Sequence, residues 1–129
     1  MSHTQATYQG CFLGLALGDA LGAPYEGGVL ERGLWWWLGS TAEGWPRWTD
    51  DTQMALDIAQ SVLAVGTLNQ EDLAQRFAHS YRWRRGYGPS TARLLKRIKR
   101  GQSWQQAATA IHPTGSFGNG AAMRAPIVA

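Results

Sequence analysis

Apolar residues recur at helical spacing along most of the chain, and glycine and proline separate the stretches in which they do so. The first stretch, residues 8–22, reads YQGCFLGLALGDALG and is apolar on more than one face, which is typical of a buried helix. Gly10, Gly14 and Gly18 recur every four residues, so one side of this helix carries no side chains. We therefore expect a buried helix that another helix approaches closely.

Two further helices are predicted over about 50–65 and from about residue 70, each with an amphipathic stripe. The stripe of the first consists of Met54, Ile58, Val62 and Val65. The second has Asn69 as its expected N-cap and acidic residues in its first turn, where they suit the positive helix N-terminus. Its core face consists of Leu73, Phe77 and Tyr81.

The rest of the chain predicts shorter helices and a glycine-rich loop. After the break at 86–89, Ser90 is expected to cap a helix that ends at Gly101, and Ser103 a short helix to about Ile111. The inward residues of the former are Leu94, Leu95 and Ile98. A loop at 115–120 then leads into the start of one more helix. No alternating strand pattern occurs, so the predicted fold class is all-α, a helical bundle.

Residues 23–48 contain two prolines, several glycines and the run Trp35-Trp36-Trp37, and they are expected to form a loop. Two interpretations of the tryptophans remain open. They could stack on a base, or they could belong to the core or to an apolar face that another segment or subunit covers. The second interpretation is favoured.

Composition is consistent with one folded domain. The chain has 129 residues, 44% of them hydrophobic, and carries a formal charge of +3. The charge is uneven, because no Asp or Glu follows Asp72. Eight of the twelve cationic residues are Arg82, Arg84, Arg85, Arg93, Lys96, Arg97, Lys99 and Arg100. This cluster could contact nucleic acid, but the small net charge favours a solvated helix face, and nucleic acid is not the expected partner.

The single cysteine, Cys11, excludes an intrachain disulfide and fits a reducing compartment. The apolar run at 11–18 is too short to span a bilayer, and no Lys or Arg precedes it as in a secretory signal. We therefore expect a cytoplasmic protein without a membrane anchor.

The motif Thr49-Asp50-Asp51-Thr52 lies where a loop meets a helix. Its adjacent carboxylates repel each other, so a positive partner is needed. That partner could be the helix N-terminus, or a hard divalent cation with oxygen ligands. On its own, the motif favours capping over a metal site.

Two other segments carry candidate chemistry. Gly18-Asp19-Ala20-Leu21-Gly22 is followed by a third acid, Glu26. The segment 115–124 reads GSFGNGAAMR, and a loop of small residues that runs into a helix offers backbone N–H groups to an anion such as phosphate.

Together and in this order, four motifs resemble the ADP-ribosylglycohydrolase family: G-D-A-L-G with Glu26, then T-D-D-T, then G-Y-G at 86–88, then G-S-F-G-N-G-A-A-M-R. The resemblance runs from about Gly10 to the last residue. It implies an all-helical fold with two metal ions, Mg or Mn, and hydrolysis of the glycosidic bond between ADP-ribose and a protein side chain or related group.

Specific roles follow from the resemblance. It implies that Thr49, Asp50 and Asp51 bind the metal ions and that Glu26 and Asp50 act in catalysis. It also implies that the cleft for ADP-ribose is lined at 86–88 and that the loop at 116–119 holds the diphosphate and distal ribose. The substrate-binding residues are thus Gly86, Tyr87, Gly88, Ser116, Phe117, Gly118 and Asn119.

The resemblance also implies a missing part. Family members continue into a second half with another Asp motif, G-D-T-D-[ST], so residues 1–129 are expected to be the N-terminal part of a single, incomplete domain. We expect little activity from this chain alone. We also expect it to self-associate or to bind a complementary second-half chain. The alternative is a non-catalytic module that binds ADP-ribose or a nucleotide, or a structural remnant.

Overall fold

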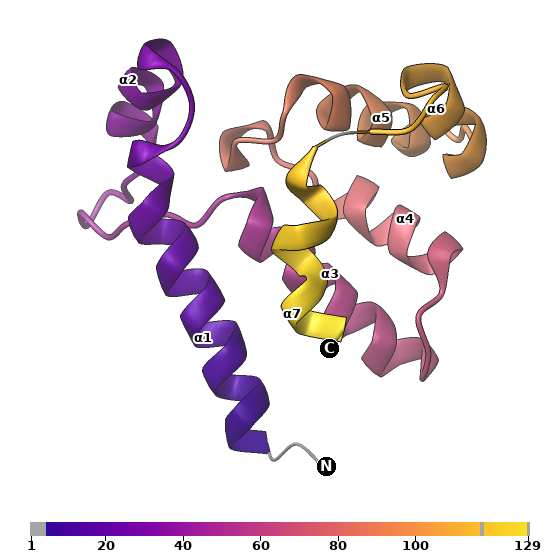
Figure 1. Ribbon diagram of the computed structural model, residues 1–129, viewed down its shortest axis with the longest axis horizontal. Coiled ribbons are helices and arrows are strands. Elements are labelled where there is room, and N and C mark those ends of the chain that lie inside the picture. The colour runs from indigo at the N-terminus through magenta and orange to yellow at the C-terminus, as the bar shows by residue number, and fades with distance from the viewer. Residues whose placement is uncertain (1–4, 117, 129) are drawn as a thin grey trace.

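The computed structural model describes residues 5–116 and 118–128. Within these ranges it contains seven α-helices and three short 3-10 helices, and the only β pairing is an isolated bridge between Ser40 and Pro46 (Figure 1). The predicted all-α class is confirmed. The α-helices are α1 (Gln5–Gly22), α2 (Val29–Leu38), α3 (Asp50–Val65), α4 (Gln70–Ser80), α5 (Pro89–Lys99), α6 (Trp104–Ile111) and α7 (Ala125–Val128). The 3-10 helices are η1 (Ala23–Tyr25), η2 (Trp83–Arg85) and η3 (Asn119–Arg124).

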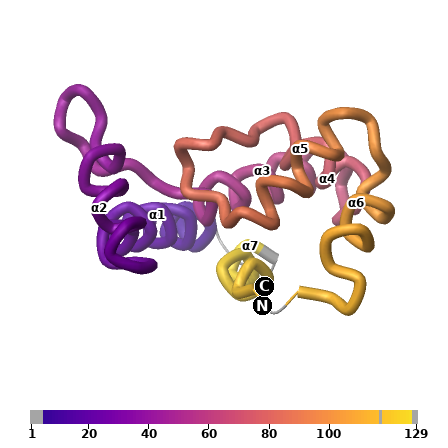
Figure 2. Tube along the Cα trace, turned by 90° about the horizontal axis from the view of Figure 1, so that it is seen from above, coloured from indigo at the N-terminus to yellow at the C-terminus, as the bar shows by residue number. Residues whose placement is uncertain are grey.

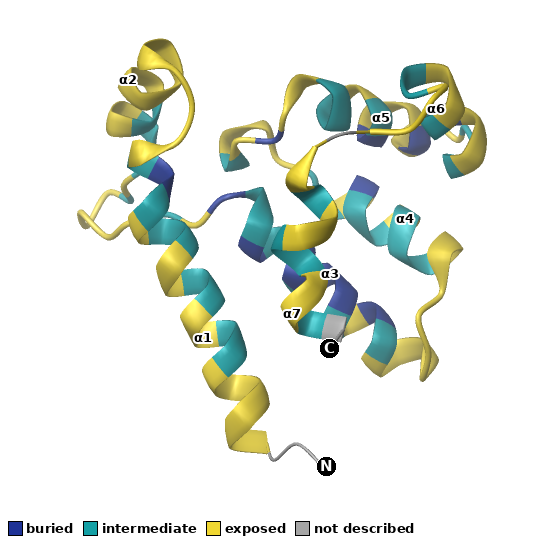
Figure 3. Cartoon of the chain, viewed as in Figure 1, coloured by how far each residue is buried: buried dark blue, intermediate teal, exposed yellow. Residues whose placement is uncertain are grey.

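The core lies between α3, α4, α5 and α6. Each of these helices packs on the next along the chain, and η3 packs on α3. Buried residues gather on this side of the molecule (Figure 3). The core cluster consists of Met54, Ala78, Tyr87, Leu95, Ile98 and Ala107. The predicted inward positions Leu95 and Ile98 are therefore confirmed, and Phe77, Tyr81 and Leu94 pack against the cluster as partly buried residues.

Local signals fixed most helix starts as predicted. The side chains of Asn69 and Ser103 accept hydrogen bonds from the first turns of α4 and α6, so both predicted N-caps are confirmed. Ser90 is not a cap, because α5 already begins at Pro89 and Gly88 occupies the cap position. Proline suits the first helical position, since its missing N–H would have no partner there.

Two expectations about the first third of the chain are wrong. Residues 29–38 form α2 rather than a loop. α1 is not buried: none of its residues falls in the buried class, and Leu13 is 71% exposed. No atom of another described element lies within 4 Å of a methyl group added at Gly10, Gly14 or Gly18, so no described helix approaches the glycine face.

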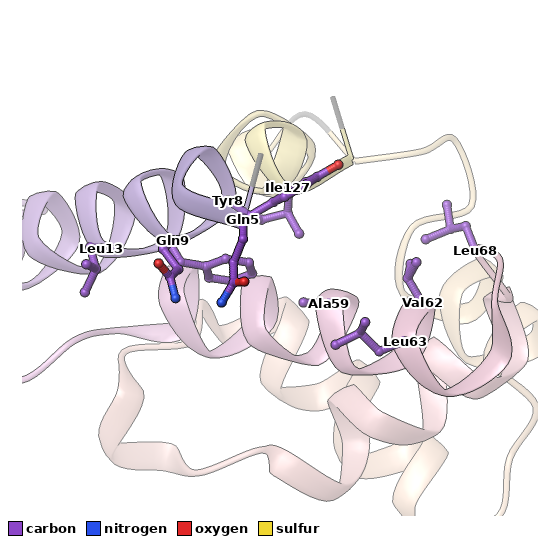
Figure 4. A pocket seen from close by; sticks show the side chains of 10 residues that line it. Gln5, Tyr8, Gln9, Leu13, Ala59, Val62, Leu63, Leu68 and Ile127 are labelled. Atoms are coloured by element: carbon purple, nitrogen blue, oxygen red, sulfur yellow. The ribbon is translucent and has the colours of Figure 1, made fainter. Parts of the chain in front are cut away.

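α1 and α2 extend to one side of the helices that form the core (Figures 1 and 2). α7 packs against both α1 and α3. Together they line an apolar groove of about 1350 Å³, in which Tyr8 of α1 and Ile127 of α7 face Val62 and Leu63 of α3 (Figure 4).

The tryptophans of α2 are largely on the surface. Trp36 is 86% exposed and Trp37 is 76% exposed, so they do not belong to the core. Trp35 is partly buried, and its indole nitrogen has no hydrogen-bond partner among the described residues. No described helix is long and apolar enough to cross a membrane.

Candidate functional site

Asp19, near the end of α1, connects that helix to the start of α3. Its Oδ2 accepts hydrogen bonds from the backbone N–H groups of Thr49 (2.9 Å) and Thr52 (3.1 Å) and from the Thr52 hydroxyl (2.5 Å). Its Oδ1 accepts one from the Thr49 hydroxyl at 2.7 Å. The first N–H groups of a helix have no partner within that helix. Asp19 therefore acts as a cap supplied by another helix, and it fixes where the T-D-D-T motif lies.

Thr49 is the N-cap of α3, as the capping interpretation of its motif expects. Its hydroxyl oxygen accepts from the Asp51 N–H at 3.2 Å while donating to Asp19. A hydroxyl has one donor and two acceptor positions, so one lone pair of Thr49 is left for a further ligand. Capping and metal binding are therefore compatible at this residue.

Asp50 and Asp51 occupy the first turn of α3, close to two other acids. Burial and then the charges of Asp51, Asp19 and Glu26 together raise the pKa of Asp50 to about 7. Burial, Asp19 and Glu26 raise the pKa of Asp51 to about 6. The carboxyl groups of Asp19, Glu26, Asp50 and Asp51 thus repel one another across the junction of α1, η1 and α3.

The donors at this junction match a hard divalent cation. Carboxylate and hydroxyl oxygens are the ligands that Mg²⁺ and Mn²⁺ prefer, and a cation would relieve the repulsion between the acids. Nevertheless, no group of three or more His, Cys, Asp or Glu side chains within 5–116 and 118–128 is arranged to hold a metal ion. The residues of this junction whose side-chain oxygens could hold such a cation are Thr49, Asp50 and Asp51.

The Gly86-Tyr87-Gly88 segment lies against Asp50. A methyl group added at Gly86 would be 3.9 Å from Oδ1 of Asp50, and the φ of Gly86 is +79°, which favours glycine. The Tyr87 side chain is buried: it is 8% exposed and meets Tyr81 edge to face at 5.0 Å. Of the predicted substrate-binding residues at 86–88, only Gly86 and Gly88 are exposed.

The predicted phosphate loop is on the surface. Ser116, Gly118 and Asn119 are exposed, and the Gly118 N–H donates to the Ser116 hydroxyl at 3.2 Å. Phe117, the remaining predicted contact, lies outside the described residues. Asn119 begins η3, so the loop is joined directly to the short helix that packs on α3.

Arg124 is a site residue to which the sequence analysis assigned no role. From the end of η3, its Nη1 reaches Sδ of Met54 at 3.3 Å, and its guanidinium lies over the Phe77 ring at 5.4 Å. Its positive charge lowers the pKa of Asp51 against the effect of burial. Its place as the last residue of G-S-F-G-N-G-A-A-M-R was the available signal.

The site thus consists of an acidic helix start, a glycine segment against it and a small-residue loop whose 3-10 helix brings Arg124 close to the acids. The chain belongs to the ADP-ribosylglycohydrolase family, whose model matches residues 1–129. It is similar to ADP-ribosylhydrolase ARH3 of Xenopus tropicalis, with 37% identity over 91% of this chain and 37% of the relative.

Other relatives agree. ADP-ribosyl-[dinitrogen reductase] glycohydrolase of Rhodospirillum rubrum is 37% identical over 89% of this chain and 41% of its own length, and human ADP-ribosylhydrolase ARH3 is 33% identical over 91% and 37%. The chain therefore spans about two fifths of the length of these relatives. No solved structure matches it significantly.

Proposed function

We propose that this chain carries the N-terminal part of the active site of a metal-dependent hydrolase that cleaves the glycosidic bond between ADP-ribose and a protein side chain or related group. The observation that carries this proposal is the convergence of Asp19, Glu26, Asp50 and Asp51 at the start of α3, with Gly86 against Asp50. The names of the relatives, which describe ADP-ribosyl hydrolases, support the substrate class.

Thr49, Asp50 and Asp51 would hold Mg or Mn through their side-chain oxygens. A bound divalent cation lowers the pKa of a water ligand and fixes neighbouring hydroxyl groups of a sugar. Glu26 is exposed at the end of η1, within electrostatic reach of Asp50 and Asp51. As a carboxylate it can accept the proton of the attacking water, and glycosidic cleavage commonly needs such assistance.

Substrate binding is proposed for the exposed backbone beside the acids. The exposed loop residues Ser116 and Asn119 would contact the diphosphate, and the helix start at Asn119 suits an anion. Gly86 and Gly88 leave room for the ribose close to Asp50, since neither has a side chain. Tyr87 packs on Tyr81 and would hold this segment in position without contacting the substrate.

The 129-residue chain alone is expected to show little turnover. Its described acids do not form a group of three metal ligands, and relatives have a further segment about one and a half times as long as the matched part. The partner of the site is therefore additional polypeptide, either in the same chain or as a complementary one. No nucleic acid is required.

A chimera tests this function. Residues 1–129 would replace the matching segment of the Rhodospirillum rubrum relative, and release of ADP-ribose from that relative's own modified protein would be followed with Mn²⁺. We expect turnover that Asp50→Asn abolishes. A folded chimera without turnover, judged by circular dichroism, would argue against the function.

Calorimetry tests the alternative function, a non-catalytic module that binds ADP-ribose or a nucleotide. Titration of ADP-ribose into the 129-residue chain is expected to show tighter binding with Mg²⁺ than without it, because the cation links Asp50 and Asp51 to the sugar. Binding of equal strength with and without the metal would favour the non-catalytic module instead.

A further inference from the structure

An arginine-rich pocket of about 400 Å³ lies next to the candidate site but is not part of it. It is formed by the loop before α3 together with the segment between α4 and α5. Its lining residues are Thr41, Arg47, Trp48, Arg82, Arg84 and Arg85. Four of these six residues are arginines, which is unusual for a protein surface where charges of both signs are normally mixed.

Three of the arginines are held in place by neutral groups. The Arg85 guanidinium stacks 4.3 Å from the centre of the Trp48 ring and donates to the Trp48 carbonyl at 2.8 Å. Nη1 of Arg82 donates to the carbonyls of His79 and Tyr81, both at 3.0 Å. The guanidinium of Arg84 lies over the ring of Trp83 at 5.4 Å. These contacts orient the guanidinium groups without neutralising them.

Among the described residues, no acid forms an ion pair with the arginines of the pocket. The only ion pair among the described residues joins Arg76 to Asp72, which are elsewhere. Burial and then the charge of Arg47 lower the pKa of Arg85, and the opposite influence of Asp19 is weaker. Glu43 feels the charge of Arg47 without forming an ion pair with it. The guanidinium groups therefore repel one another, and a bound anion would reduce this repulsion.

The wall that carries Arg47 is an ordered loop. The Thr41 N–H donates to the Trp45 carbonyl at 2.9 Å, and the Arg47 N–H donates to the Gly39 carbonyl at 2.7 Å. These bonds close a short turn around Gly44, whose φ is +84°. The pocket therefore has two ordered walls, with oriented guanidinium groups on one and Arg47 and Trp48 on the other.

Both walls lead directly into the candidate site. Trp48 is followed by Thr49, the N-cap of α3, and Arg85 is followed by Gly86, which lies against Asp50. A ligand in the pocket would therefore be adjacent to the acidic cluster, at its rim.

We propose that this pocket binds a phosphate or diphosphate group. The planar guanidinium group donates two parallel hydrogen bonds to phosphate oxygens, which is why arginine predominates in phosphate recognition. This site is additional to the loop at 116–119, to which the proposed function assigns the diphosphate of ADP-ribose. It does not depend on metal binding or on hydrolysis.

Calorimetry with inorganic pyrophosphate, in buffer free of divalent metal, tests the proposal on the 129-residue chain. The pocket variant is Arg47→Gln with Arg84→Gln, which spares the backbone contacts of Arg82 and Arg85. The control is Arg97→Gln with Arg100→Gln, which removes the same charge from exposed positions of α5 and its C-cap. Circular dichroism confirms that both variants fold.

We expect saturable binding at one site in the wild type, weakened about tenfold or more in the pocket variant and less than about twofold in the control. Asp50→Asn should not weaken it, so this result is independent of the proposed hydrolase. Equal weakening in both double variants, or no saturable binding, would overturn the proposal. So would binding to a single-stranded oligonucleotide in the absence of pyrophosphate binding, because the surface would then be one for nucleic acid.

A competition experiment identifies the source of the group. If ADP-ribose displaces pyrophosphate from the wild type, the pocket takes the diphosphate of a substrate. If ADP-ribose displaces no pyrophosphate, the pocket binds the phosphate group of a different ligand.

Discussion

Asp50 carries most of the electrostatic conflict in the candidate site. It lies at the first position of α3, where the helix dipole favours a carboxylate. Burial and three neighbouring acids act in the opposite direction and raise its pKa to about 7. The charge of Asp50 is therefore unfavourable in the metal-free chain, and removing it would relieve the repulsion between the acids.

Asp50→Asn is therefore expected to stabilise the metal-free chain at pH 8 by about 1–2 kcal/mol. The folded state of the wild type holds a proton on Asp50 more tightly than the unfolded state does, so its stability falls as pH rises from about 4 to 7. The variant should lose that part of the slope. Urea denaturation with EDTA at pH 5 and pH 8 measures both effects.

Glu71→Gln is the matched control for this prediction. Glu71 also lies in the first turn of a helix, α4, but it is exposed. We expect its replacement to change stability by less than about 0.5 kcal/mol at either pH. If Asp50→Asn destabilised the metal-free chain at pH 8, the proposed repulsion between the acids would not exist.

At the scale of elements, Asp19 makes the polar contact between α1 and α3. α1 has no residue in the buried class, so its apolar packing is only partial. The four hydrogen bonds of Asp19 with Thr49 and Thr52 add to that packing. They also orient the first turn of α3, which carries Asp50 and Asp51.

Asp19→Asn should therefore separate α1 from α3. An amide has one acceptor oxygen and presents N–H groups to donors, so we expect a loss of about 2–3 kcal/mol. Hydrogen exchange should become faster in α1 and the first turn of α3 and remain unchanged in α4 to α6. Glu31→Gln, an exposed acid of α2, serves as the control. Unchanged exchange in α1 would show that Asp19 does not hold it.

Elements with local signals could be predicted from the sequence. Thr49, Asn69 and Ser103 are side-chain caps that precede apolar stripes, and all three begin helices in the structure. α2 has no such signal, because its cap is Gly28 without a side-chain hydrogen bond. Its glycines and tryptophans therefore resembled a loop.

The site could be predicted only in part. The ordered motifs indicated which segments carry chemistry, but periodicity does not show contacts between distant segments. Asp19 reaches residues 30 and 33 positions away, and Arg124 reaches Met54 from 70 positions away. The inward direction of Tyr87 is likewise a result of packing, since an aromatic residue between two glycines can face either way.

At the scale of the whole molecule, much apolar surface remains accessible. The groove between α1, α3 and α7 has Leu63 on its α3 side, where it is 86% exposed, and Leu13 on its α1 side. Contiguous apolar surface of this kind marks interaction sites. In a purified sample of this chain, only a second copy can cover it.

We therefore expect the 129-residue chain to self-associate. Sedimentation velocity over a range of concentrations should show a species larger than the monomer, which Leu63→Glu shifts to monomer. Gln60→Glu is the control, because it adds the same charge at an exposed position of α3 that does not line the groove. A strictly monomeric wild type at high concentration would contradict the expectation.

The central claim is that Asp50 and Asp51 bind a divalent cation, and binding of Mn²⁺ followed by electron paramagnetic resonance tests it most directly. We predict that the wild-type chain binds Mn²⁺ and that Asp50→Asn with Asp51→Asn abolishes this binding. Asp57→Asn should retain it, because that buried acid of α3 bonds instead with Ser80 and Gln53. Mn²⁺ binding of the same strength in the Asp50 and Asp51 variant, or none in the wild type, would contradict the account.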